Sequence, residues 1–151
     1  RLVTGATFSN LQPGIMVMFK YDPKLKDKLP YYDQFPIVIP FGKDAEGFIG
    51  LNIHYLDYRN RLILLTKLAQ FEVQMSNNEK KYLMKWQFIK SVSKFPQVAP
   101  WVKRYLFDHV KSRYLKIPND DTVVVSQLPL HKFVGARETF VWSRSRKMIG
   151  R

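Results

Sequence analysis

The sequence predicts an α+β domain in which a small SH3-like β-barrel or curled antiparallel sheet is followed by a helical part with a late strand. Three observations support this fold class. Short apolar runs separated by proline and glycine turns fill residues 1–56, helical apolar spacing begins at residue 57, and a β-branched run returns at 122–128. We therefore divide the chain into a β-barrel-like part, 1–56, and a helical part with a basic tail, 57–151, within one compact domain.

The first two strands are expected on either side of a charged loop. Residues 14–21 place apolar side chains at every second position, which is typical of a strand with one buried face. Residues 22–30 are charged and bounded by prolines, so we interpret them mainly as a solvated connection. The apolar run 35–41 contains Pro36 and Pro40, which confine it to a sheet edge or to a bent strand.

A turn at 42–47 and a third strand at 48–55 complete the predicted sheet. Before the second strand, Tyr31 and Tyr32 have two interpretations. They could stack on unpaired bases, or they could close the end of the barrel, and we favour packing.

Three helices and a strand are expected after residue 57. Asp57 is a suitable N-cap for the first, whose apolar stripe would be Tyr58, Leu62, Leu65 and Ala69. A capping box beginning at Ser76 starts the second, which should end before Pro96. The third begins at Pro100 and runs to about Leu115, and 122–128 forms the late strand.

The chain is strongly basic. It has 25 lysines and arginines against 12 acidic residues, a formal charge of +13, and residues 101–151 alone carry 11 basic and 4 acidic residues. A folded surface so far from neutrality is built to meet an anionic partner, and nucleic acid is the commonest one. We therefore expect phosphate contacts mainly in the last third of the chain.

The third predicted helix carries the first group of candidate phosphate contacts. Lys103, Arg104 and Lys111 lie beside its apolar stripe, and Arg113 and Lys116 follow near its end. This face could lie along a phosphate backbone, where each neutralised phosphate releases a counterion. It could equally be a solvated helix face whose last cations suit the helix dipole.

The tail carries the second group. Arg144, Arg146 and Lys147 follow closely on one another, with Arg137 upstream. Arginine offers bidentate phosphate contacts that lysine does not. We favour anion binding here over a frayed terminus or a strand that docks on another protein.

The sequence offers little support for catalysis. It has no cysteine, so disulfides, thiolate metal sites and cysteine nucleophiles are excluded. The histidines have no partner at metal-ligand spacing, and the glycines form no phosphate-binding motif. His109 is better interpreted as a hydrogen-bonded core residue than as a catalytic one. We therefore expect that the protein is not an enzyme and that it binds no cofactor, metal ion or small-molecule ligand. We also expect no membrane-spanning segment.

Several stretches together are similar to a known family. They are Pro13–Lys24, Leu29–Pro36, Gly47–Leu56, Lys103–Leu106 and Ser112–Arg113. They resemble small virion or virion-assembly proteins of large contractile-tailed bacteriophages, over most of residues 13–118. The closest role is that of a DNA end protector or head-completion protein. The resemblance implies a non-enzymatic protein of the virion, and of the host cytoplasm during assembly, that meets a DNA terminus and head or neck subunits.

Three hypotheses follow, in order of preference. In the first, the chain is a phage structural protein that binds DNA without base specificity through phosphate contacts. In the second, its cations meet acidic surfaces of a baseplate, tail or neck protein, for which it acts as an adaptor. In the third, it is a metal-dependent nuclease with an unfamiliar site around Asp44, Glu46 and His54.

Overall fold

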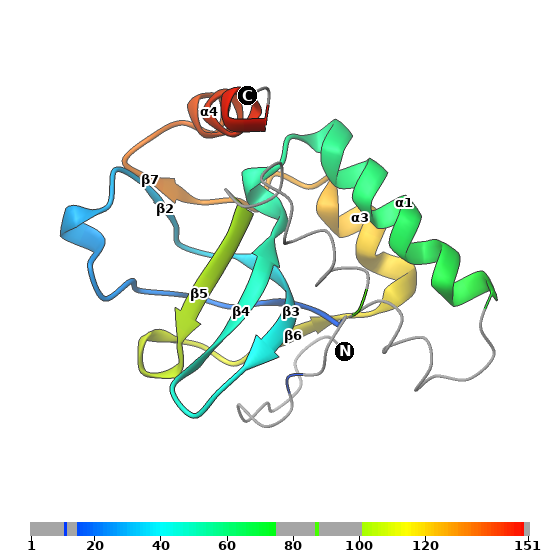
Figure 1. Ribbon diagram of the computed structural model, residues 1–151, viewed down its shortest axis with the longest axis horizontal. Helices are drawn as coiled ribbons and strands as arrows, with labels where there is room; N and C mark the ends of the chain where they lie inside the picture. The colour runs from blue at the N-terminus through cyan, green and yellow to red at the C-terminus, as the bar shows by residue number, and fades with distance from the viewer. Residues whose placement is uncertain (1–10, 12–14, 75–86, 88–100, 150–151) are drawn as a thin grey trace.

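The computed structural model describes residue 11, residues 15–74, residue 87 and residues 101–149, and Figure 1 shows their arrangement. The strands are β1 (Met16–Met18), β2 (Tyr32–Asp33), β3 (Ile37–Lys43), β4 (Gly47–Asn52), β5 (Val102–Leu106), β6 (Leu115–Ile117) and β7 (Phe133–Val134). The helices are α1 (Tyr58–Gln74), α3 (Thr122–Ser126) and α4 (Glu138–Ile149), with short 3-10 turns at Lys26–Lys28, Ile53–Tyr55, Phe107–His109 and Asn119–Asp121. None of these described helices is long and apolar enough to cross a membrane.

An antiparallel sheet with the strand order β5-β4-β3-β1-β6 forms the centre of the molecule. A separate two-stranded ribbon pairs β2 with β7. The α+β class is confirmed, with a curled sheet: in the described part of the chain, β5 and β6 lie at opposite edges of the strand order and do not close a barrel. Strands β5 and β6 come from the part of the chain predicted to be helical.

Both faces of the sheet are buried. Ile15, Val17, Phe19 and Tyr21 contact one apolar cluster, which is rich in aromatic rings, so the predicted alternation in the first strand is confirmed. Met16 points to the opposite cluster, which lies against the helices. Figure 1 shows α1 and α3 side by side on that helical side. Because both faces are covered, the strands carry apolar residues at consecutive positions.

Strand β3 is the central strand of the sheet, which corrects the expectation of an edge. Its alternative, a bent strand, is confirmed, because the pairing of β3 with β4 shifts register between Pro40 and Gly42. A proline has no N–H to donate, so a bulge is the position where a central strand tolerates it. The missing N–H of Pro40, which led to the expectation of an edge strand, is thus accommodated by the register shift between Pro40 and Gly42.

The third predicted helix, from Pro100 to about Leu115, is wrong over all its described residues: after β5 the chain forms the 3-10 turn Phe107–His109, a loop, and then β6 from Leu115. Val102–Leu106 is the edge strand β5, paired antiparallel with β4 from Gly47↔Leu106 to Leu51↔Val102. The apolar positions also fit a strand, since the buried Trp101 and Tyr105 stand four residues apart with Lys103 between them. The strongly apolar surface offered by β4 decides between the two patterns.

Two further expectations for the C-terminal part are corrected. Residues 122–128 do not form a strand, because Thr122–Ser126 is the helix α3, whose Ser126 hydroxyl donates to the carbonyl oxygen of Val123 at 2.7 Å. The tail is neither frayed nor a strand, because Glu138–Ile149 forms α4. Among residues 138–147 of α4, the buried positions are Val141 and Ser145, which stand four residues apart.

The first helix begins where the sequence predicts it. The Asp57 carboxylate accepts from the backbone N–H of Asn60 at 2.9 Å, as an N-cap does. The predicted stripe is only partly right, because Leu62 and Ala69 are exposed. Among residues 58–69, the buried positions of the helix are Arg61, Leu65 and Leu68. The predicted helix from 76 to 96 lies outside the described residues.

Arg61 is fully buried and joins the start of α1 to α3. Its guanidinium donates to the backbone carbonyls of Ile53, His54, Leu56 and Ser126 at 2.8 to 3.3 Å. Burial lowers the pKa of this guanidinium to about 10. The bonds replace its lost hydration, so the charge is tolerated in the core.

Candidate nucleic-acid interface

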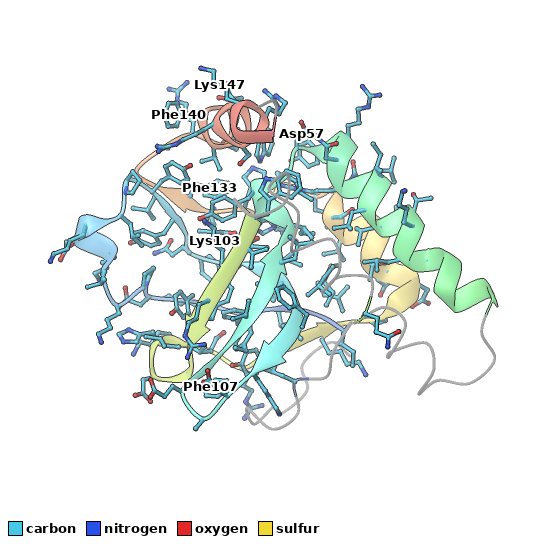
Figure 2. The ribbon with its side chains drawn as sticks, in the orientation of Figure 1. Asp57, Lys103, Phe107, Phe133, Phe140 and Lys147 are labelled. Atoms are coloured by element: carbon cyan, nitrogen blue, oxygen red, sulfur yellow. The ribbon has the colours of Figure 1, made fainter. Side chains whose placement is uncertain are left out.

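A pocket of about 410 Å³ lies between the edge strand β5 and the segment of residues 21–33. Its walls combine tyrosine rings with cations. The tyrosines are Tyr21, Tyr31, Tyr32, Tyr55 and Tyr105, and the cations are Lys24, Lys103 and Arg104. Figure 2 shows Lys103 on β5, on the side of the strand where residues 22–32 run.

The ammonium of Lys103 is desolvated in this pocket. Its Nζ lies 4.3 Å from the centre of the Tyr55 ring, and burial lowers the pKa of this lysine. Among the described residues, no carboxylate or carbonyl oxygen accepts a hydrogen bond from it. A buried cation without an anionic partner costs free energy, so the pocket is suited to an anion.

Arg104 is exposed and is held at the mouth of the pocket by an ion pair. Its Nη2 lies 3.0 Å from a carboxylate oxygen of Asp44, in the turn between β3 and β4. The hydrogen bond from Arg104, with those from the backbone of Glu46 and Gly47, lowers the pKa of Asp44 to about 2. Several of the five N–H donors of the guanidinium remain available for a ligand.

The opposite wall of the pocket is formed by Tyr31 and Tyr32, which are half-buried. Tyr32 belongs to β2 and pairs with Val134 of β7. The turn after β7 supports Tyr31 from behind, because Gly135 has φ +97° and a Cβ there would lie 2.5 Å from the carbonyl oxygen of Pro30. A glycine is therefore required for this close approach.

A buried carboxylate fixes this wall to the sheet. Asp33 accepts from the backbone N–H groups of Phe35 and Lys132 at 3.1 and 3.2 Å, from the Asn52 amide at 3.2 Å, and from His54 Nδ1 at 2.6 Å. Burial raises the pKa of Asp33, but the bond from His54 and the other donors outweigh it, and the pKa lies below its usual range. The carboxylate is therefore ionised and its oxygens are occupied.

Helix α4 carries the basic residues of the tail. Arg144 lies with its Cζ 5.9 Å from the centre of the Tyr31 ring, so it adjoins the pocket. Arg146 points elsewhere, because it pairs with Asp57 at 2.9 Å. Lys147 and Arg137 are exposed, the latter directly before the helix. Figure 2 shows Lys147 and Phe140 projecting from α4.

The remaining sequence-predicted residues are not brought to the pocket. Lys116 lies on β6, at the sheet edge opposite the β5 edge that carries Lys103 and Arg104. Lys111 and Arg113 are exposed in the connection between these strands, where the Lys111 ammonium donates to the carbonyl oxygen of Asp108 at 3.2 Å. The structure thus joins Lys103, Arg104 and Arg144 around one pocket and leaves the others dispersed.

The candidate nuclease residues are not assembled. His54 is buried against Asp33, while Asp44 and Glu46 lie in the turn at the far end of β4. Six extended residues separate the two groups, which corresponds to roughly 20 Å. Among the described residues, no group of three histidine, aspartate or glutamate side chains is arranged to hold a metal ion. His109 is half-buried, and its Nδ1 lies 2.9 Å from the carbonyl oxygen of Asp22.

Sequence reasoning missed the pocket as a unit. Tyr55 and Lys103 stand 48 positions apart in the chain, and no spacing rule connects them. The available signal was the pair Tyr31 and Tyr32 beside the basic loop that contains Lys24. Stacking on bases was one of the two interpretations of that pair, and the half-exposed position of both rings is compatible with it.

A comparison with known protein families was made for the whole chain. A family model described as the Phage T4 terminal DNA protecting protein matches residues 1–148, nearly the whole chain. No curated protein and no solved structure matches it.

Proposed function

We propose that this chain, which belongs to the family of the Phage T4 terminal DNA protecting protein, binds the ends of phage DNA through phosphate contacts that do not read base sequence. The observation that carries the proposal is the set of cations around the tyrosine pocket, among which Lys103 has no anionic partner in the described part of the chain. We expect this activity in the virion, or in the infected host cytoplasm during assembly.

The contacts are proposed to centre on the pocket and the adjoining face of α4. Lys103 and Arg104 lie on the pocket wall, and Arg144 adjoins it through Tyr31. Lys147 stands three residues after Arg144, so the two share one face of the helix.

The remaining basic residues named from the sequence are not assigned phosphate contacts by this proposal. Arg146 is engaged by Asp57 and is proposed to fix α4 rather than to bind phosphate. Contacts from Lys111, Arg113, Lys116 and Arg137 remain predictions from the sequence.

Binding of this kind has a measurable signature. Each phosphate neutralised on duplex DNA lowers the slope of log K against log salt by about 0.9. The proposal therefore requires affinity that falls steeply with salt and changes little with base sequence. A protein that recognises bases would instead discriminate between duplexes at constant salt.

The experiment measures anisotropy of a labelled linear duplex over a salt series, with wild type, the double variant Arg144→Gln/Lys147→Gln and the control Lys67→Gln. Lys67 is an exposed cation on α1, outside the pocket lining, and its replacement also removes one charge. We expect the double variant to flatten the salt slope by about 1 to 2 units and the control to leave it unchanged.

Exonuclease digestion gives a second readout, in which bound wild type should slow degradation of the linear duplex. A salt slope of zero, or equal slopes for the double variant and wild type, would overturn the phosphate-contact mechanism.

A further inference from the structure

We infer that the tyrosine pocket holds one unpaired terminal nucleotide of a DNA end, with its base against Tyr32 and its phosphate at Lys103 and Arg104. The inference rests on the proposed function and adds to it the reason why an end is preferred to the interior of a duplex. It is carried by the size of the pocket, its free aromatic surface and its unpaired charge.

The size of the pocket suits one nucleotide. Its volume of about 410 Å³ lies within the range of about 300–1,000 Å³ that is typical of small-ligand sites. A duplex, whose major groove alone is about 12 Å wide, does not enter a space of this volume. The pocket can therefore accept a single residue of the chain that leaves the helix, while the duplex stays outside.

Tyr32 offers an aromatic face for the base. Among the described rings it has no stacking partner, whereas Tyr31 lies with its ring centre 6.2 Å from those of Tyr55 and Phe140. Tyr105 and Tyr21 are committed to the core, since the Tyr105 hydroxyl accepts from Asn52 and the Tyr21 hydroxyl from the backbone of Leu106. Stacking of a base on tyrosine tolerates every base, which suits a protein that reads no sequence.

The charges of the pocket suit a terminal phosphate. Lys103 supplies a desolvated ammonium over the Tyr55 ring, and Arg104 supplies a planar guanidinium at the mouth. Asp33 also borders the pocket, but its carboxylate oxygens are occupied by their four donors. A phosphate at the rim therefore meets positive charge first. A phosphate beside Lys103 supplies the anionic partner that this ammonium lacks and so offsets part of the cost of its burial.

The geometry explains a preference for ends. A base inside a duplex reaches such a pocket only after unpairing and unstacking, and the free-energy cost of this step is smallest for an already single-stranded base. A terminal overhang has no such cost. A DNA end with an unpaired nucleotide should therefore bind more tightly than a fully paired stretch of duplex.

The test compares two DNA probes that share the same duplex sequence. The first is a duplex with a 5′-phosphorylated overhang of a single nucleotide, and the second is a dumbbell closed by loops at both ends. We expect wild type to bind the overhang duplex more tightly than the dumbbell. Tyr32→Leu should reduce this preference by about 5- to 150-fold, because stacking of a base contributes about 1–3 kcal/mol.

The matched variants separate the loss of the ring from a loss of folding. Tyr32→Phe keeps the aromatic face and should keep the end preference, while Tyr32→Leu should lose it at an unchanged melting temperature. Lys103→Met keeps the packing over Tyr55 and should abolish the advantage of a 5′-phosphorylated over an unphosphorylated overhang. Tyr32→Leu and Tyr32→Phe should not change the binding of the dumbbell by more than about 3-fold, because that binding depends on phosphate contacts and not on the Tyr32 ring.

The outcomes distinguish this inference from the proposed function. If wild type binds neither probe, the proposed function is wrong. If it binds both probes equally, or if Tyr32→Leu keeps the end preference, the pocket does not hold the terminal nucleotide although phosphate binding stands. If Tyr32→Leu and Tyr32→Phe lose the preference together, the ring does not act by stacking and the inference is overturned.

Discussion

Replacing Asp33 by asparagine should destabilise the protein strongly, because its carboxylate is the acceptor for four donors in the core. Each oxygen accepts two hydrogen bonds, one from His54 Nδ1 at 2.6 Å. Asparagine has a single acceptor oxygen and no charge. Its NH2 group faces either the N–H groups of Phe35 and Lys132, or the Asn52 amide and His54, where a change of the His54 tautomer relieves one of the two conflicts. The Asn52 amide cannot turn to compensate without loss, because its own oxygen accepts from the backbone of His54 at 2.9 Å.

The magnitude follows from the lost acceptors and the lost charge. A buried unsatisfied donor costs about 1–3 kcal/mol, and hydrogen bonds to a charged group are stronger than those to a neutral one, so Asp33→Asn should lower the free energy of unfolding by about 2–6 kcal/mol. For a chain of 151 residues, this corresponds to a fall of about 4–20 °C in melting temperature at pH 7. The control is Asp27→Asn, at an exposed position of the loop between β1 and β2, which should change the melting temperature very little.

The pH dependence has a definite sign. Because folding lowers the pKa of Asp33, the stabilisation by its carboxylate is complete above the unfolded pKa of about 3.9 and is lost as the pH falls through the lower folded value. Thermal denaturation followed by circular dichroism between pH 7 and pH 3 should show wild type and Asp33→Asn converging at the acidic end. A fall of less than about 4 °C at pH 7, or a constant difference down to pH 3, would refute the reasoning.

Three further predictions concern the elements around the pocket. Gly135→Ala should lower the free energy of unfolding in urea by about 1–3 kcal/mol, because φ is +97° and the new methyl meets the carbonyl oxygen of Pro30; a neutral result would contradict the close approach. Arg146→Gln should cost less than about 1 kcal/mol by the same measurement, since its ion pair with Asp57 is exposed, and the cost should vanish near 1 M salt. Arg61→Met should cost at least about 3 kcal/mol, because buried backbone carbonyls lose their donors; a smaller loss would show that water replaces the guanidinium.

The fold was predictable where a segment has one dominant pattern. The alternating residues of 15–21 and the start of α1 after Asp57 follow from local sequence and are confirmed. The segment 102–106 fits two patterns, and its partner β4, about fifty residues earlier, decides between them. The β-branched residues of 122–125 prefer strands, but they form the helix α3, which packs on α1. Intrinsic preference is a weak guide where packing decides.

The site was less predictable than the fold. The sequence identified Lys103 and Arg104 as candidates, but as members of a helix face, whereas they lie on a strand edge beside tyrosines from another part of the chain. Burial and missing partners distinguish Lys103 from the other lysines, and neither is visible in a sequence. Charge counting identified the class of partner and could not show which cations share a surface.

The pairing of distant segments has a consequence for the order of folding. Strands β3 and β4 are neighbours in the chain, whereas β1 joins β6, and β2 joins β7, across about one hundred residues. Closing such long loops costs chain entropy, and this cost precedes the stabilising contacts between the paired strands. The β3–β4 hairpin should therefore form early, and the β1–β6 and β2–β7 pairs should form late. The wall that carries Tyr32 depends on β7, and a nascent chain that ends before β7 has the hairpin without that wall. The wall that carries Tyr32 is therefore completed only after β7 has been synthesised.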